Sequence, residues 1–354
     1  MTVRTTVSER KHVIVPSQVG LGDTDMGYLS TGLARRRGPK PYRVAWGLNG
    51  TQYLVGEGVE YFAEPLQTTV LDRLADGPDA RALTYAALGA LLGPGEHRIA
   101  LVVGLPVQVM ADRSAARDTI RRMKAWLLGR HRFRFDGKET VVEVAALKVL
   151  TQGLGAFYAW ALDDAGKPVR RVQDLKAPVG VVDVGFNTVD LFTVREGRVD
   201  RRLTAGDREG VRRAVLDLLE YVRRQYRVRL SYMQADALLR QKRPVLSYAG
   251  GDVDLSDAVR HIVDRAGRRL AEFIEATWDR EVWGFRHVLA VGGGARLFWP
   301  HLRRVLPHAL LMSRPDPVLA NAVGFARYGR MVMPDAETVV GLDPGFGAFK
   351  AVLL

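Results

Sequence analysis

Residues 337–354, at the end of the chain, constrain its fold more than any other stretch. An apolar run leads into a glycine-punctuated turn that carries Asp343, and Lys350 opens a second apolar run. This pattern predicts a strand, a tight turn and a returning strand. Gly345 and Gly347 allow the backbone to approach a ligand closely and to aim amide N–H groups at it, which would suit a polyanion.

A second copy of this layout begins at Val179. One Asp-x-Gly-Phe sequence is weak evidence for a binding site, because a β-turn favours Asp and Gly for its own reasons. Two copies, each between apolar runs, predict a duplicated hairpin whose two loops face one ligand. The matching residues are Asp183 and Asp343, Gly185 and Gly345, and Phe186 and Phe346.

Composition narrows the class of protein. The 354 residues suffice for two cores or for one large α/β unit with an insertion, and 47% hydrophobic with 26% charged residues is ordinary for a globular protein. The absence of cysteine excludes disulfides and thiolate metal sites, so a metal would need oxygen or imidazole ligands. Without a membrane-length apolar run or a signal-like start, the chain is predicted to be cytoplasmic.

The net charge of +13 suits a nucleic-acid partner, but most basic residues are interleaved with Asp and Glu. Arg35, Arg36 and Arg37, with Lys40 and Arg43, form the compact basic cluster. An arginine-rich solvated surface is the simpler interpretation, and contact of this cluster with DNA or an anionic membrane is the alternative.

Alternating strand and helix patterns predict an α/β fold. Strands at 42–48 and 52–55 are expected to pair through Asn49-Gly50, and residues 99–103 form a buried strand that runs into Gly104. A helix is expected to open near Gln152. The polar stretch 163–176 is interpreted as a boundary between domains.

The second half continues the alternation. The second hairpin is expected to continue into a third strand at 198–203, and Gly206 precedes an amphipathic helix. The strand 288–291 runs into Gly292, Gly293 and Gly294, and three glycines at a strand-to-helix turn suit a nucleotide's phosphate or sugar.

Taken together, these motifs resemble those of the actin, sugar kinase and heat-shock chaperone superfamily, and most of all actin-like proteins of the ParM/StbA plasmid-segregation kind. Residues 341–350 look like the first phosphate motif, 182–190 like the second and 291–295 like the adenosine motif. Weaker matches are 104–106, as a strand end, and 151–153 and 320–324, as interdomain helices.

The resemblance implies an actin-like two-domain α/β fold, with a duplicated mixed-sheet core and a nucleotide cleft between the domains. The first domain would comprise 1–22, 95–170 and 331–354, the insertion subdomain 23–94, and the second domain 171–330. In the family the first phosphate motif opens the chain, whereas here it closes it. We therefore expect a circular permutation in which residue 354 lies beside the first strand.

The resemblance also implies a site for ATP, with GTP as an alternative, and for Mg²⁺. Asp343 and Asp183 would be catalytic and hold hydrated Mg²⁺, and Gln152 would orient the attacking water, which predicts slow turnover. Gln234 and Asp236 are candidates for contacts to the base. The expected nucleotide-binding residues are Gly345, Phe346, Gly347, Lys350, Gly185, Phe186, Asn187, Thr188, Gly206, Gly292, Gly293 and Gly294.

A filament-forming ATPase for plasmid segregation or cytoskeletal organisation is the function implied, with copies of itself and a DNA-bound adaptor protein as partners. One alternative is a metabolic kinase of the same superfamily, which would need a general base where Gln152 stands. Another is a nucleotide-binding scaffold for DNA or membrane, which the basic cluster at Arg35 to Arg37 keeps open.

Overall fold

The computed structural model describes residues 11–22, 40–47, 50–63, 73–208 and 210–354. The chain forms two compact units, each described by itself below. The first unit is Met1–Leu105, Val109–Val169 and Asn321–Leu354, and the second is Pro106–Gln108 and Arg170–Ala320. Residues 321–330, which the sequence interpretation placed in the second domain, lie in the first unit.

A nine-stranded mixed sheet forms the frame of the first unit, in the order β1-β17-β16-β5-β7-β6-β3-β4-β2. Its centre is parallel, because β5 pairs in parallel with both β16 and β7. Consistent with the continuous apolar run at its centre, β5 is buried from Ile99 to Leu105. The strands are β1 (Lys11–Pro16), β2 (Val19–Leu21), β3 (Tyr42–Trp46), β4 (Gln52–Val55), β5 (Gly95–Leu105), β6 (Gly129–Phe135), β7 (Lys138–Thr151), β16 (Val339–Pro344) and β17 (Ala348–Leu353).

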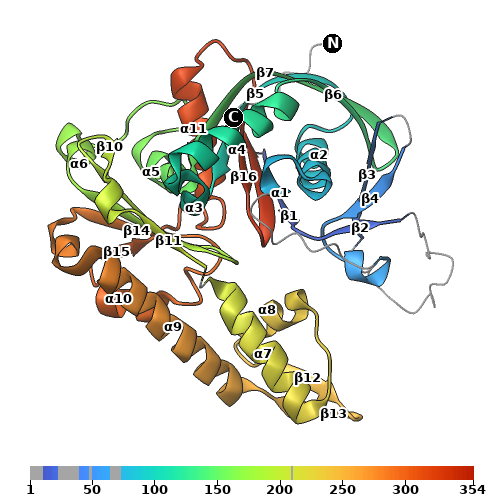
Figure 1. Ribbon diagram of the computed structural model, residues 1–354, viewed down its shortest axis with the longest axis vertical. Coiled ribbons are helices and arrows are strands. Elements are labelled where there is room, and N and C mark those ends of the chain that lie inside the picture. The colour runs from blue at the N-terminus through green and yellow to red at the C-terminus, as the bar shows by residue number, and fades with distance from the viewer. Residues whose placement is uncertain (1–10, 23–39, 48–49, 64–72, 209) are drawn as a thin grey trace. The chain divides into compact units, whose positions relative to one another are not determined.

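Helix α2 lies within the curve of this sheet (Figure 1) and contacts β1, β17 and β3. It is apolar nearly all round, as expected of a helix enclosed on several sides. Helices α5 and α11 approach closely at Gly155, where an added Cβ would meet the Asn321 backbone at 2.7 Å. The helices of this unit are α1 (Arg73–Asp76), α2 (Pro78–Leu92), α4 (Arg113–Leu127), α5 (Gln152–Ala161) and α11 (Ala320–Val332), with α3 (Val107–Ala111) at the boundary and a 3₁₀ turn at Val59–Tyr61.

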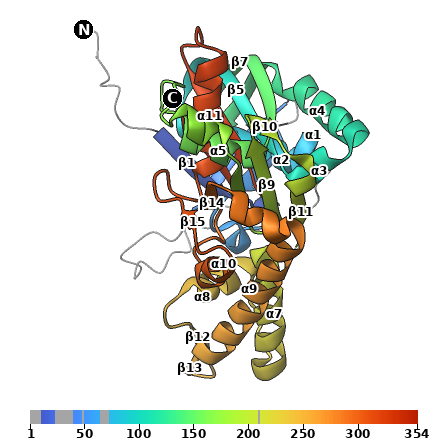
Figure 2. The ribbon, with the colours of Figure 1, turned by 90° about the vertical axis from the view of Figure 1, so that its left-hand side faces the viewer.

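The second unit is built on the sheet β10-β9-β8-β14-β15, with β11 also paired to β9. Helices α7 and α9 run side by side (Figures 1 and 2), and their apolar stripes, which the sequence predicted, pack into one core with the sheet. The strands are β8 (Val179–Val184), β9 (Val189–Arg195), β10 (Arg198–Val199), β11 (Ala205–Asp207), β12 (Val245–Tyr248), β13 (Gly251–Asp254), β14 (His287–Val291) and β15 (Ala309–Leu311). The helices are α6 (Val172–Lys176), α7 (Val211–Tyr226), α8 (Tyr232–Arg240), α9 (Ser256–Trp278) and α10 (Trp299–Val305), with 3₁₀ turns at Arg201–Leu203 and Asp279–Gly284.

Both units repeat one strand arrangement. Hairpin β16–β17 in the first unit corresponds to hairpin β8–β9 in the second. On one side of each hairpin lie two further parallel strands, β5 and β7 or β14 and β15. On the other side lies an antiparallel third strand, which is β1 in the first unit and β10 with β11 in the second. The duplicated mixed-sheet core that the family resemblance implied is therefore present.

Local predictions failed where elements are short. The strand expected at 198–203 ends at Val199 and gives way to a 3₁₀ turn, because Asp200 accepts the amide of Arg202 and turns the backbone. The hairpin β12–β13 and helix α8 were not predicted. Each of the two hairpin strands spans only four residues, too few for alternation to stand out from chance.

Candidate functional site

The two hairpin turns have the same geometry. Asp343 lies opposite Lys350 across one hairpin, and Asp183 lies opposite Asp190 across the other. The amide of Gly345 donates to the carbonyl of Ala348 at 3.1 Å, and the amide of Gly185 donates to the carbonyl of Thr188 at 2.9 Å. These two glycine amides close their own turns, which narrows the expected phosphate-binding amides to those of Phe186, Asn187, Phe346 and Gly347.

Three of the predicted site residues meet in the first unit. The carboxylate of Asp343 is 2% exposed. Its Oδ2 lies 2.8 Å from Lys350 Nζ, and its Oδ1 accepts a 2.7 Å hydrogen bond from Gln152 Nε2. Gln152 donates a further bond to the carbonyl of Pro344 at 3.3 Å. Each carboxylate oxygen of Asp343 therefore has a partner, and Gln152 is held at the turn of the hairpin.

Ser17, which sequence reasoning missed, fastens this turn. Its Oγ donates to the carbonyl of Gly345 at 2.6 Å, and its amide donates to the carbonyl of Gly347 at 3.1 Å. Ser17 follows the end of β1, which pairs with β17. No local signal could have marked it, because its hydrogen-bond partner lies 328 positions away in the sequence.

In the second unit, Asp183 lies one residue before the end of β8 and packs against the triple-glycine turn. Gly292 has φ +87°, and a Cβ added there would clash with Asp183 Oδ1 and the carbonyl of Val184. The amide of Gly292 donates to Pro317 at 2.9 Å, and that of Gly294 donates to Val184 at 2.8 Å. Two of the three glycines thus serve packing, and Gly293 is the one that faces open space.

Gly206 and the start of α7 complete the candidate site residues of the second unit. Gly206 pairs with Asp190, and an added Cβ would lie 2.7 Å from Asp190 Oδ1, so a larger residue would displace this carboxylate. The amides of Val211 and Arg212 donate to the carbonyls of Gly185 and Phe186 at 3.2 and 2.7 Å. The first turn of α7 therefore holds the hairpin turn in place.

The side chains of four further predicted residues have structural roles. Phe346 is buried, and Phe186 packs against the core of the second unit. Thr188 Oγ1 donates to Asp190 Oδ2 at 3.4 Å, and Asn187 is buried. In these four residues the backbone, rather than the ring or the polar group of the side chain, is the part suited to a ligand.

Helix α8 brings an arginine to the triple glycine. Gln234 closes a capping box with Ser231, and Asp236 forms a two-point ion pair with Arg240 at 2.8 and 2.9 Å. Arg240 Nη1 donates to the carbonyl of Gly293 at 2.6 Å. The hydrogen bonds of Gln234 and Asp236 described above go to Ser231 and Arg240, not to the glycine turn. Sequence reasoning missed Arg240 because it missed helix α8.

The described carboxylates offer a divalent cation few direct ligands. Within the described ranges, no group of three or more His, Asp or Glu side chains could hold a metal ion. Asp343 already has Lys350 and Gln152 on its two oxygens, so it fits Mg²⁺ through water rather than by direct ligation.

Arg35, Arg36 and Arg37 lie outside the described residues. Of their predicted neighbours, Lys40 is exposed, and Arg43 donates its backbone amide to Asp136 Oδ1 at 2.9 Å. In the described part of the chain, every helix is too short or too polar to cross a bilayer.

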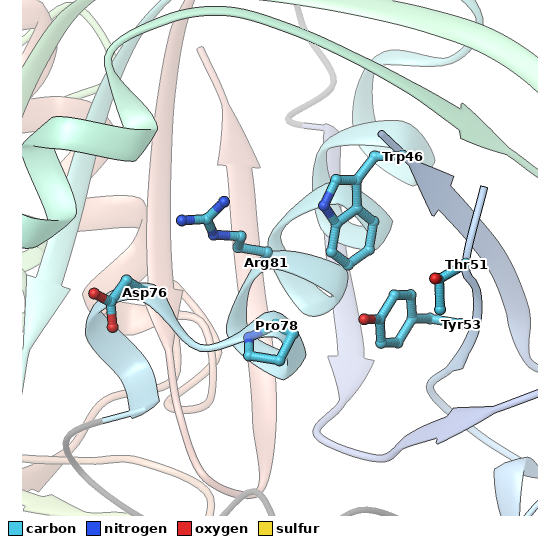
Figure 3. Close-up of a pocket in the computed structure, with 6 residues that line it drawn as sticks. All are labelled: Trp46, Thr51, Tyr53, Asp76, Pro78 and Arg81. Atoms are coloured by element: carbon cyan, nitrogen blue, oxygen red, sulfur yellow. The ribbon is translucent and has the colours of Figure 1, made fainter. Parts of the chain in front are cut away.

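A pocket of about 250 Å³ lies in the first unit, apart from the candidate site residues (Figure 3). The rings of Trp46 and Tyr53 are stacked at 4.5 Å on one side of it, and Arg81 reaches toward it from α2. No predicted site residue lines it. Its lining consists of Trp46, Thr51, Tyr53, Asp76, Pro78 and Arg81.

Comparison with protein families gives two matches that follow one another along the chain. Residues 3–155 match the model of the actin-like proteins' N-terminal domain, and residues 181–304 match that of the archaeal actin homologue, MreB-like, C-terminal domain. The chain is an actin-like protein.

Solved structures agree with this actin-like fold. The archaeal actin homologue Ta0583 has a TM-score of 0.68 at 18% identity, over 89% of this chain and 91% of that one. A non-polymerisable ParM mutant from pCBH has a TM-score of 0.71 at 18% identity, over 90% and 93%. A 15-stranded ParM filament from Clostridium botulinum has a TM-score of 0.64 at 17% identity, over 90% and 93%. No curated protein matches the sequence.

Proposed function

We propose that this actin-like protein binds ATP with Mg²⁺, hydrolyses it slowly and forms filaments in its nucleotide-bound state, in the cytoplasm. The observation that carries the proposal is the contact of buried Asp343 and Gln152 with the partly buried Lys350 at the turn of one hairpin, together with Asp183 at the same place in the second copy.

The roles follow from the chemistry of these groups. The amides at Phe346 and Gly347, and at Phe186 and Asn187, would hold phosphate oxygens, and Lys350 would neutralise charge that develops on the phosphates. Asp343 and Asp183 would hold hydrated Mg²⁺, which supplies charge neutralisation at the phosphates when bound. Gly206, Gly292, Gly293 and Gly294 would shape the nucleoside side of the site.

Gln152 would orient the attacking water. Its amide is already held by Asp343 and Pro344, so its position is defined before a ligand arrives. Because an amide is a poor base, it can position water but cannot strongly accept its proton, and turnover is expected to be slow. Slow hydrolysis suits a switch between assembled and disassembled states.

Similar structures include a ParM filament and an Alp12 filament, which supports self-assembly. An archaeal actin homologue in complex with ADP is also similar, which supports nucleotide binding. Head-to-tail contacts between copies generate open filaments naturally. A role in moving plasmid DNA through a DNA-bound adaptor protein, or in organising a cytoskeleton, would use such filaments.

The first test is light scattering of the full-length protein with ATP and Mg²⁺ against a nucleotide-free control. We expect a rise that depends on nucleotide and reverses as phosphate is released. No rise at tens of micromolar protein would count against polymerisation.

The second test is Asp183→Asn, with Asp257→Asn as the matched control because that carboxylate is 83% exposed. Phosphate release is expected to fall about 100-fold in the first variant and to stay unchanged in the control, with nucleotide affinity altered much less than turnover. Unchanged phosphate release in Asp183→Asn would remove Asp183 from the mechanism.

A metabolic kinase is the second candidate. It would transfer phosphate to a small acceptor and would release little phosphate without one. Gln152, rather than a carboxylate, lies beside Asp343, which favours water as the acceptor. Phosphate release in the absence of any added acceptor separates the two candidates.

A further inference from the structure

Arginine and tyrosine side chains gather where α7 ends in the second unit. Arg227 follows the last turn of α7 in a left-handed conformation, with φ +56°, and the chain then continues outside helix and strand to Leu230. Val228 and Leu230 pack against the core, whereas Arg227 and Arg229 are exposed. Exposed and partly buried residues therefore alternate from Arg227 to Leu230, and both arginines are on the solvent side.

The hairpin β12–β13 adds to this surface beside the end of α7 (Figures 1 and 2). The ring of Tyr248, on this hairpin, meets that of Tyr226 edge-on at 5.3 Å. Lys242 and Arg243 precede the hairpin and are exposed. We call this region the arginine–tyrosine surface; it comprises Arg223, Arg224, Arg227, Arg229, Lys242, Arg243, Tyr226, Tyr232 and Tyr248.

Positive charge is in excess on the arginine–tyrosine surface. Arg223 and Arg224 share one carboxylate, Glu220, and Arg243 pairs with Asp254 at 3.4 Å. Asp252, on the same hairpin, bonds to Ser247 at 3.1 Å. Over the described ranges, Arg227, Arg229 and Lys242 have no carboxylate partner. These three cations are free to meet an external anion.

We propose that the arginine–tyrosine surface binds the phosphate backbone of duplex DNA. Guanidinium, ammonium and phenol groups are the donors that proteins direct at phosphate oxygens. Because Tyr226 and Tyr248 are packed edge to face against each other, their rings are occupied, and Tyr248, which is 41% exposed, can offer its hydroxyl. Such contacts would be independent of base sequence and strongly dependent on salt.

Composition favours DNA over a membrane or a protein partner. Among the described residues from Arg223 to Asp254, the exposed large hydrophobic side chains are Tyr232 and Tyr248. A membrane-binding surface would present apolar groups to insert, and a stable protein interface would have an apolar centre. The surface does not include the candidate nucleotide site, so the inference stands or falls separately from ATP hydrolysis.

The test uses the full-length protein and fluorescence anisotropy of a labelled random-sequence duplex at several salt concentrations. The test variant is Arg227→Glu with Arg229→Glu. The matched control is Arg303→Glu with Arg304→Glu. These two arginines are exposed on α10 of the same unit, and their substitution changes the net charge by the same amount. Thermal unfolding checks that both fold, and the corresponding Gln variants replace any Glu variant that does not.

We expect affinity for the duplex to fall at least tenfold in the Arg227 and Arg229 variant and less than about threefold in the control. The slope of log K against log salt concentration should become shallower by about two, because two phosphate contacts are lost. Equal losses in the two variants would show attraction to net charge alone and would overturn the proposal. Absence of duplex binding by the unaltered protein, or binding to anionic vesicles in its place, would also overturn it.

Discussion

Lys350 is the counter-charge of a carboxylate that is almost completely shielded from water. Its ammonium lies 2.8 Å from Asp343, whose side chain is 2% exposed. Lys350→Met would keep the length of the side chain and leave Asp343 with Gln152 as its remaining polar partner among those described. We expect the free energy of unfolding to fall by about 3 kcal/mol, because a buried charge loses its partner.

Urea denaturation measures this loss, with Lys148→Met, an exposed lysine on β7 of the same unit, as the control. A loss no larger than that of the control would mean that the contact between Lys350 and Asp343 does not stabilise the fold.

Gly292 and Gly293 are neighbours with opposite tolerance for a side chain. A methyl group at Gly292 would clash with Asp183 and Val184 in a backbone conformation that L-residues avoid, whereas at Gly293 nothing lies within 4 Å of the added Cβ. Gly292→Ala should therefore cost about 2 kcal/mol of stability, and Gly293→Ala much less than this. Thermal unfolding of the two variants side by side would refute this account if they lost the same stability.

At the scale of elements, His131 ties β6 to α4 and α2. Its Nε2 lies 2.8 Å from the carbonyl of Leu127, and its Nδ1 lies 3.1 Å from the hydroxyl of Tyr85. Burial lowers the pKa of His131, the Leu127 carbonyl opposes this, and Arg81 lowers it further. The neutral ring, which can donate to one partner and accept from the other, is therefore the form that packs in the folded protein.

The sign of the pH effect follows from this lowered pKa. Below the unfolded-state pKa of about 6.5, the unfolded chain takes up a proton that the folded protein resists, so stability is highest above pH 6.5 and falls as the pH drops toward the folded pKa. Denaturation at about pH 7.5 and pH 5.5 should show a smaller drop for His131→Gln than for the unaltered protein. His261→Gln, an exposed histidine on α9, is the control. An identical drop in all three proteins would exclude His131 as the source.

At the scale of the whole molecule, the two units have the same strand arrangement but a different order of strands along the chain. In the second unit the third strand follows its hairpin directly, as β10 and β11 follow β9. In the first unit the equivalent strand is β1, whose Lys11 lies opposite Leu353 of β17. The end of the hairpin thus lies beside the strand that would continue it, which supports the proposed circular permutation.

A re-ordered chain tests this proposal. It would begin at residue 333, run through residue 354 and a short glycine-rich linker into residue 11, and end at residue 332. We expect it to fold with nearly the same unfolding midpoint, because β16, β17 and β1 keep their pairings. The control is a chain opened within β5, which pairs on both edges. Failure of the first variant under conditions that fold the original protein would contradict the proposal.

The sequence by itself determined the α/β class, the two hairpins and the apolar stripes of α7 and α9, because strand alternation, turn glycines and helical periodicity act over short distances. It also named Asp343, Lys350 and Gln152 as candidate site residues through the motifs that carry them, and the structure brings these three side chains together. Tertiary structure decided how these residues are held. Ser17 reaches Gly345 across 328 positions, and Arg240 reaches Gly293 across 53, so neither leaves a local pattern to read.

Only the tertiary structure showed which glycines pack and which face open space. The clash that excludes a side chain at Gly292 comes from Asp183, a residue more than a hundred positions earlier. Short elements such as β12, β13 and α8 depend on the core against which they pack, because propensity over four to nine residues is too weak to specify them. The arginine–tyrosine surface exists only because that core brings the end of α7 and the hairpin together.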